Sequence, residues 1–219
     1  MPVSWSAIGT LAAVALGAWA VRRVWWGYPP APPDAKVLSR REIAFLAAAA
    51  DATYPSGGPV PPSGSEAGVP SYADRYVAAV PPGTGLLMRL LFFLVEHATL
   101  AFPAPGRGGR RRFSSLSPDQ RGAVLEAWGT SSWFPRRLVF SSLRAILTMG
   151  YFADPVVLRA LDLAPRAIET PVVEADLLYP PIGAPRDAIR HRPGDLSPIG
   201  GAPVGPGAPL HPAYREPAS

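Results

Sequence analysis

The chain begins with an uninterrupted apolar stretch. No charged residue occurs from Val3 to Val21, and bulky aromatic residues lie near its ends, namely Trp5, Trp19, Trp25, Trp26 and Tyr28. At about 1.5 Å per residue, a helix of this length can cross the roughly 30 Å hydrocarbon layer of a bilayer, and Trp and Tyr are typical of its interfaces. The pattern predicts a transmembrane anchor over residues 1–27, followed by a Pro-rich linker over residues 28–38.

The charges around this stretch indicate a retained anchor and its orientation. A cleaved signal peptide carries positive charge before its apolar run, whereas Arg22 and Arg23 follow the run here. Together with Lys36, Arg40 and Arg41, these arginines predict a domain on the cytoplasmic side of a bacterial inner membrane, which the chain crosses once. Small residues recur at every fourth position in this stretch, at Gly9, Ala13 and Gly17. They are candidates for packing against a second transmembrane helix. The alternative is that they reflect a general abundance of Ala and Gly.

Helical periodicity dominates the middle of the chain. Ser39 with Glu42 and Ser117 with Gln120 have the spacing of capping boxes, and Asp154-Pro155 is a third helix start. Three further segments have helical spacing without the alternation of strands, namely Ser71–Val80, Gly85–Phe102 and Pro135–Tyr151. The interpretation is all-α: a single N-terminal transmembrane helix, a small helical bundle over residues 39–165, and a C-terminal tail.

One of these segments is apolar nearly all round. Polar side chains interrupt Leu86–Phe102 only at Arg89, Glu96, His97 and Thr99. Such a helix lies either in the centre of a bundle or against lipid. Because the charged side chains would need partners inside a membrane, burial in the bundle or at an interface is favoured, with membrane insertion as the alternative.

Pro and Gly crowd the tail, residues 166–219, which has no pattern for a core of its own. We expect Glu169–Gly183 to be an extended arm laid across a partner and the chain beyond Pro206 to be disordered. A plain disordered tail is the other interpretation. The arm's candidate partner-binding residues are Leu177, Leu178, Tyr179, Pro180 and Pro181.

Charge and cysteine content limit the kinds of partner and site that this chain can have. The net charge is +5, which suits anionic lipid or an acidic partner, and there is no cysteine. Disulfides, thiolate nucleophiles, iron–sulfur clusters and cysteine-bound zinc are therefore excluded. A glycine-rich loop leads directly into three arginines, Arg110, Arg111 and Arg112. Together with Arg22 and Arg23, they are candidates for contact with lipid or an acidic partner. The alternative is that these side chains are simply solvated. The wide basic face with interleaved aromatics that nucleic-acid binding requires is missing, so no nucleic-acid partner is expected.

The sequence shows no catalytic, metal or cofactor site. The only histidines are His97, His191 and His211, and no pair has metal-ligand spacing. Glu96 and His97 are adjacent, so they point about 100° apart on a helix. No serine lies in a nucleophile elbow, and the Gly106–Gly109 loop lacks the strand and helix of a dinucleotide site. We expect no enzyme activity and no cofactor in this chain; a small hydrolase using His97 is a weak alternative.

The middle of the chain resembles a known family. Arg41–Leu46 leading to Asp51–Pro55, and Phe113–Ser117 followed by Gln120-Arg121, resemble the gluconate 2-dehydrogenase subunit 3 family. The region is also similar to the N-terminal helical part of long-chain fatty alcohol oxidases, in the segments Leu86–Leu94, Phe134–Leu138 and Tyr151–Pro155. The resemblance covers about residues 37–165.

This resemblance implies a non-catalytic subunit that accompanies an FAD-dependent oxidoreductase of the glucose–methanol–choline type. FAD and the catalytic base are then expected in a separate chain, and no catalytic residue carries over to this one. The expected function is to anchor and stabilise an alcohol or sterol dehydrogenase or oxidase at the membrane, in contact with membrane lipid. An enzyme-independent single-pass membrane scaffold or assembly factor is the alternative.

Overall fold

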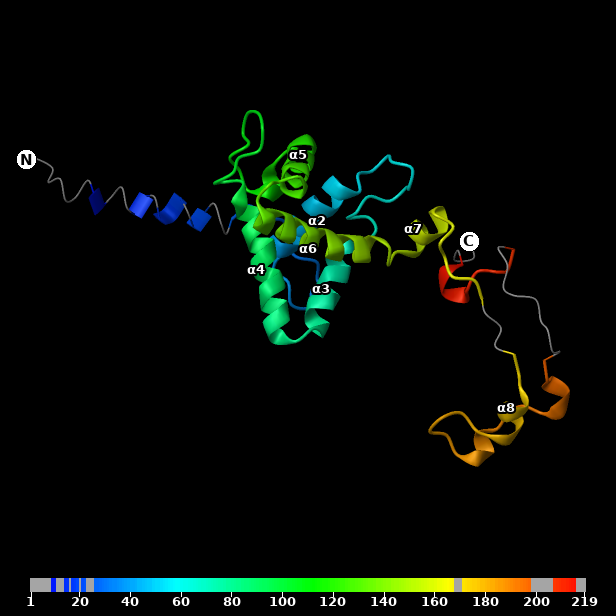
Figure 1. Cartoon of the computed structure of the whole chain (residues 1–219). Coiled ribbons are helices and arrows are strands. Elements are labelled where there is room, and N and C mark those ends of the chain that lie inside the picture. Colours follow the sequence, from blue (N-terminus) through cyan, green and yellow to red (C-terminus); the bar gives the residue numbers. More distant parts are fainter. Residues whose placement is uncertain are drawn as a thin grey trace, which may run out of the picture. The chain divides into compact units, whose positions relative to one another are not determined.

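A computed structural model of the chain describes residues 9–10, 14–15, 17–19, 21–22, 26–167, 171–197 and 207–215. Every regular element in these ranges is helical, which confirms the all-α fold class (Figure 1). The chain divides into one compact unit, Met1–Leu161, and a second, Asp162–Ser219. The helices of the first unit are α2 (Arg40–Thr53), α3 (Val69–Ala79), α4 (Pro82–Ala98), the 3₁₀ turn η1 (Phe113–Ser115), α5 (Pro118–Gly129), α6 (Phe134–Tyr151) and α7 (Pro155–Ala160).

The predicted helix starts are confirmed by their capping bonds. At α2 the backbone N–H of Ser39 donates to Glu42 Oε2 over 2.7 Å. At α5 the bonds between Ser117 and Gln120 are reciprocal, each 3.3 Å long. At α7 the Asp154 carboxylate accepts two backbone N–H groups of the first turn, and Pro155 occupies the first helical position.

Helix α2 is the centre of the first unit, since it packs against α3, α4, α5, α6 and η1. Its run of alanines, with Ala49 and Ala50 fully buried, lets neighbouring backbones approach closely. At its other end Phe45 lies between two aromatic rings, with centroids 6.1 Å from Phe92 of α4 and 5.6 Å from Phe113 of η1. Small side chains on one part of α2 and the aromatic contacts of Phe45 on another thus allow five elements to pack on one helix.

The Pro-rich linker is held against the bundle. The Asp74 carboxylate of α3, itself buried, accepts the backbone N–H groups of Lys36, Val37 and Leu38 over 2.6–3.0 Å. Burial favours the neutral acid, but these three donors favour the carboxylate and hold the pKa of Asp74 below its usual range. The turn that leads into α2 is therefore fixed by a charged side chain from another helix.

The predicted anchor lies mostly outside the described residues. The described residues between 9 and 22 are all helical, whereas Ala13 and Arg23 are not described. Both Gly9 and Gly17 are exposed, and an added Cβ would meet no described atom within 4 Å. Among the residues that the structure describes, no helix combines the length and the apolar character that a membrane span needs. The anchor and its Gly9–Ala13–Gly17 face therefore stay predictions.

The second unit contains short helical turns within the predicted tail. Residues Glu174–Leu178 form the helical turn α8 rather than an extended arm, because the Asp176 carboxylate caps the turn by accepting the Val173 N–H over 2.9 Å. Residues 207–215 contact the start of the unit, and the disorder expected beyond Pro206 stays a prediction. There, Ala167 donates its N–H to the Pro209 carbonyl over 2.7 Å, and His211 donates its N–H to the Pro165 carbonyl over 2.9 Å. Three 3₁₀ turns complete the unit: Arg186–Ala188, Pro193–Asp195 and Pro212–Tyr214.

Candidate functional site

Helix α4 exposes a continuous apolar face. One side of the helix, with Phe92 and Val95, is buried against the bundle. The other side repeats large apolar residues at helical spacing, and all five are about half exposed or more: Leu86, Leu87, Leu90, Phe93 and Leu94. Figure 1 shows α4 beside α3, projecting from the rest of the bundle. An exposed apolar face of this kind is typical of a protein or membrane contact. The structure therefore buries one side of this segment and exposes the other.

The buried side of α4 carries a charged residue, Glu96, which is 3% exposed. Its carboxylate accepts the Tyr28 hydroxyl over 2.8 Å, and the Ser114 backbone N–H and hydroxyl over 2.9 and 2.6 Å. Burial raises the pKa of Glu96 above its usual range, although these bonds and the nearby Arg112 favour the charged form. Burial and the adjacent Glu96 raise the pKa of the Tyr28 hydroxyl. Glu96 thus joins the linker, α4 and η1.

Arg112 completes this connection from the other side of the Tyr28 ring. Its guanidinium lies 3.9 Å above the ring centroid and donates to the Trp26 and Gly27 carbonyls over 2.6 and 2.8 Å. A third bond reaches the Ser115 hydroxyl over 2.7 Å. The guanidinium therefore holds the backbone that leaves the N-terminal helix. We call Tyr28, Glu96 and Arg112 the linker clasp.

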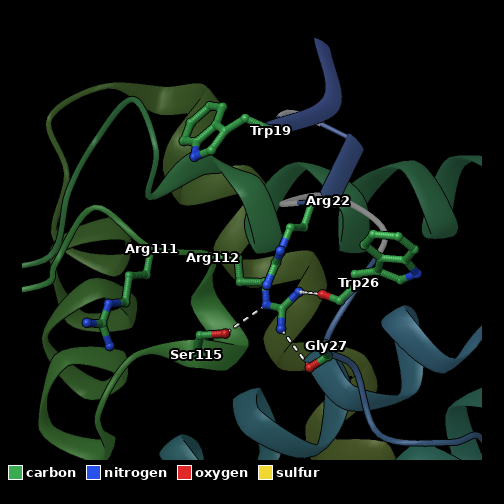
Figure 2. A pocket seen from close by; sticks show the side chains of 7 residues that line it. All are labelled: Trp19, Arg22, Trp26, Gly27, Arg111, Arg112 and Ser115. Atoms are coloured by element: carbon green, nitrogen blue, oxygen red, sulfur yellow. Dashed lines mark hydrogen bonds between the residues drawn. The ribbon is translucent and has the colours of Figure 1, made fainter. Parts of the chain in front are cut away.

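Beside the linker clasp, the structure brings together arginines that are far apart in the sequence. A hollow of about 600 Å³ is lined by Trp19, Arg22, Trp26, Gly27, Arg111, Arg112 and Ser115. Figure 2 shows Arg22 reaching from the N-terminal helix toward Arg112, whereas Arg111 lies on the other side of Arg112 and points away from it. We call this the basic hollow, because three of its lining residues are arginines and none is acidic. The candidates Arg22, Arg111 and Arg112 therefore all line this hollow, whereas Arg110 does not line it and Arg23 is outside the described residues.

A second aromatic cluster lies where α6 begins. Arg136 places its guanidinium 4.0 Å from the Phe102 ring centroid and 5.9 Å from that of Trp133. Arg137 lies 5.8 Å from the Phe134 ring. Phe102, Trp133 and Phe134 are all about half exposed or more. Arginines on exposed aromatic rings are frequent in protein interfaces, so this cluster adds a second possible contact area.

In the second unit, the candidate partner-binding residues are accessible. Leu178 and Tyr179 are largely exposed, at the end of α8. Tyr179, Pro180 and Pro181 line an open hollow of about 580 Å³ within this unit. The structure thus keeps the five candidates on one short segment, with a helical turn at its start.

The histidines do not form a site. The His97 ring packs beside Phe93 on α4, with 4.5 Å between the ring centroids, and His191 and His211 lie in the second unit. In the ranges that the structure describes, no three His, Asp or Glu side chains are grouped as metal ligands.

Sequence reasoning missed the linker clasp and the outer face of α4. Tyr28 was taken as an interfacial aromatic residue, and Glu96 as an interruption of an apolar segment and a neighbour of His97. The signal in the sequence was an acidic residue within an apolar helix, because a charge there requires a partner. The identity of that partner, 68 positions away, depends on the tertiary fold.

Comparison with known proteins gives one match. The model of a family described as gluconate 2-dehydrogenase subunit 3 matches residues 40–168, which is more than half of the chain. The match includes α2 to α7, the outer face of α4 and most of the linker clasp, and it excludes the N-terminal helix. No curated protein and no solved structure matches the chain.

Proposed function

The chain belongs to the gluconate 2-dehydrogenase subunit 3 family, and we propose that it is a non-catalytic accessory subunit of a flavin-dependent dehydrogenase complex. Its catalytic partner in this proposal is an FAD-containing oxidoreductase of the glucose–methanol–choline type that acts on an alcohol or a sterol. FAD and the reacting groups belong to that partner, and this chain binds and stabilises it.

The outer face of α4 is the observation that carries the proposal. Five large apolar side chains lie along one side of a helix whose opposite side is packed in the core. Burying such a face against a protein removes apolar surface from water, at roughly 25 cal/mol per Å². The flanking Arg89 forms an ion pair with Glu42 over 2.7 Å, so the helix is fixed to α2. A rigid apolar helix suits a permanent subunit contact.

The membrane part of the proposal rests on the sequence. A helix over residues 1–27 would anchor the complex in a bacterial inner membrane, with the domain in the cytoplasm as Arg22 indicates. The enzyme would then work beside substrates dissolved in the bilayer. The linker clasp supports this arrangement, because it ties the backbone at Trp26 and Gly27 to the bundle and so would transmit the position of the anchor to the domain.

Co-purification from native membranes tests the proposal. We expect the full chain to carry a flavoprotein with it at a fixed ratio, with the flavin in the larger chain. Leu87→Asp and Leu90→Asp place a charge in the outer face of α4 and are expected to abolish the association. Val156→Asp is the matched control, because Val156 is also an exposed apolar residue but lies on α7.

Variants in the second unit extend this test. Leu178→Ser and Tyr179→Ser remove its most exposed candidate residues, whereas Leu196→Ser alters a less exposed apolar residue of the same unit. We expect only the first two to weaken retention of the flavoprotein. A chain that is stable and monodisperse alone, with no flavoprotein in its membranes, contradicts the accessory function and favours a membrane scaffold or assembly factor.

A further inference from the structure

A group of aromatic rings and arginines lies where α6 begins. We call it the α6 cluster, and its members are Phe102, Trp133, Phe134, Arg136 and Arg137. The three rings are 48–63% exposed. An aromatic side chain has about 150–250 Å² of surface, so three half-exposed rings offer roughly 300 Å² of apolar surface. A standard protein interface covers about 800 Å² on each partner. The α6 cluster is therefore too small to hold a globular partner by itself, and it suits a short segment of one.

The two arginines of the α6 cluster have no acidic counterpart. Within the ranges that the structure describes, neither Arg136 nor Arg137 forms an ion pair. The Nε of Arg136 is buried and has no hydrogen-bond partner among these residues. Arg137 donates to the backbone carbonyls of Ser131 and Ser132 over 2.6 and 3.0 Å, and neither acceptor carries a charge. The described part of the chain thus leaves two positive charges that a carboxylate would neutralise.

Apolar and cationic surfaces alternate within the α6 cluster. The Arg136 guanidinium lies 4.0 Å from the Phe102 ring centroid and 5.9 Å from that of Trp133. Arg137 lies 5.8 Å from the Phe134 ring centroid. A helix that lies on a membrane surface keeps its apolar and charged side chains on opposite faces. Here each cation lies against a ring, and Arg beside aromatic residues is typical of the residues that dominate the binding energy of protein interfaces. This arrangement favours an acidic protein segment over the anionic surface of a bilayer.

We propose that the α6 cluster binds a short acidic segment of the flavoprotein partner. The aromatic rings contact apolar side chains of that segment, and Arg136 and Arg137 bind its carboxylates. The guanidinium fork of arginine suits the two oxygens of a carboxylate. This inference rests on the proposed function, and it adds to the outer face of α4 a second contact of different chemistry. Salt screens the charged contact and has little effect on the apolar one.

The α6 cluster begins close to the outer face of α4. The N–H of Phe102 donates to the carbonyl of Ala98, the last residue of α4, over 2.8 Å. Leu94, the last residue of the outer face, lies one turn before Ala98. Only this turn separates the outer face from the segment that carries Phe102, so one partner can contact both surfaces.

The test uses the complex of the full chain and its flavoprotein, purified from native membranes and immobilised through this chain. The readout is the rate at which the flavin absorbance leaves the complex. Between about 0.1 M and about 1 M NaCl the Debye length falls from about 10 Å to about 3 Å, and we expect the wild type to dissociate at least about tenfold faster at the higher salt. Arg136→Gln and Arg137→Gln should each dissociate about tenfold faster at the lower salt, with a smaller further effect of salt.

Arg75→Gln is the matched control for charge. Arg75 is exposed on α3 and does not belong to the α6 cluster, so its dissociation rate should stay within about twofold of the wild type. Equal acceleration in all three arginine variants would show general charge attraction and would overturn the proposal. Phe134→Ser is a second probe, because it removes an exposed ring and leaves both arginines and the buried core in place. A wild-type dissociation rate in Phe134→Ser also overturns the proposal.

Photo-crosslinking identifies the occupant of the α6 cluster. With p-benzoylphenylalanine in place of Phe134, irradiation of the complex should give an adduct with a flavoprotein peptide rich in Asp and Glu, which mass spectrometry identifies. The same group in place of Val156, an exposed residue of α7, is the control and should give little adduct. A phospholipid adduct at position 134 would assign the cluster to the bilayer. That outcome, an adduct with a neutral or basic peptide, or no adduct contradicts the proposal.

The same experiments separate this inference from the proposed function. A flavoprotein complex that forms and shows neither the salt effect nor the acidic adduct rejects the acidic segment alone, and the accessory function stands on the outer face of α4. Native membranes in which no flavoprotein accompanies the chain reject the accessory function, and the acidic segment with it.

Discussion

The Tyr28 hydroxyl donates a 2.8 Å hydrogen bond to Glu96 Oε1 across 68 positions of the chain. Tyr28 belongs to the linker that follows the N-terminal helix, and Glu96 lies on the buried side of α4. Arg112 covers the other face of the same ring. The segment that follows the predicted anchor is therefore attached to α4, the helix that carries the exposed apolar face. The predicted anchor and the proposed protein contact are thus linked through the same helix.

Replacing Tyr28 with Phe keeps the ring under Arg112 and removes only the bond to Glu96. A hydrogen bond to a charged or strongly polar buried group contributes about 1.5–3 kcal/mol, and we expect a loss of this size in the free energy of unfolding. Urea denaturation of the full chain in an uncharged detergent, followed by circular dichroism, measures it. Tyr76→Phe is the control, because Tyr76 is partly exposed on α3 and should change stability by less than about 0.5 kcal/mol.

The raised pKa of Glu96 predicts that its contribution to stability decreases with pH. The unfolded chain titrates near the ordinary value of 4.5, and burial raises the folded-state pKa above it. The folded state therefore holds this proton more tightly, and the stabilisation present below about pH 4.5 is lost as pH rises through the folded-state pKa. Relative to Glu96→Gln, the wild type should become less stable between pH 4 and pH 8. A constant difference across this range contradicts the prediction.

Asp74 should show the opposite dependence on pH. Its pKa is lowered by the three backbone N–H groups of Lys36, Val37 and Leu38, which prevail over burial. Its stabilisation is present above the ordinary value of 3.8 and is lost as pH falls through the folded-state pKa. Asp74→Asn should cost about 1–3 kcal/mol at pH 7, because an amide nitrogen would face one of the three donors. The cost should diminish toward pH 3 in the same denaturation assay.

Gly64 permits the close approach of its loop to α2. A Cβ at this position would lie 2.5 Å from the carbonyl carbon and oxygen of Ala50, which are backbone atoms of the central helix. Gly64→Ala should therefore destabilise the bundle by about 1–3 kcal/mol. Gly83→Ala is the control, because a Cβ there meets no atom within 4 Å in the first turn of α4, and better helix propensity should leave stability equal or slightly higher. Thermal unfolding midpoints compare the two.

Local sequence was sufficient for the helices and the fold class. The starts at Ser39, Ser117 and Asp154 depend on side chains that accept backbone N–H groups two or three residues away, so the signal and its effect lie in the same short segment. Local reasoning was less reliable in the tail. The turn at Glu174–Leu178 is marked only by Asp176, and the pairing of 165–167 with 207–211 joins segments that have no common pattern.

The sequence by itself thus determined that this chain is helical, begins with an apolar run and belongs with a known family of small subunits. Only the tertiary structure decided which side of α4 is exposed, because that segment is apolar nearly all round and its periodicity favours neither side. Tertiary packing also decided that Arg22 and Arg112 line one hollow and that Tyr28 meets Glu96. These contacts form because the other helices pack around α2 in one core. No local sequence pattern predicts which of two segments so far apart in the chain will come into contact.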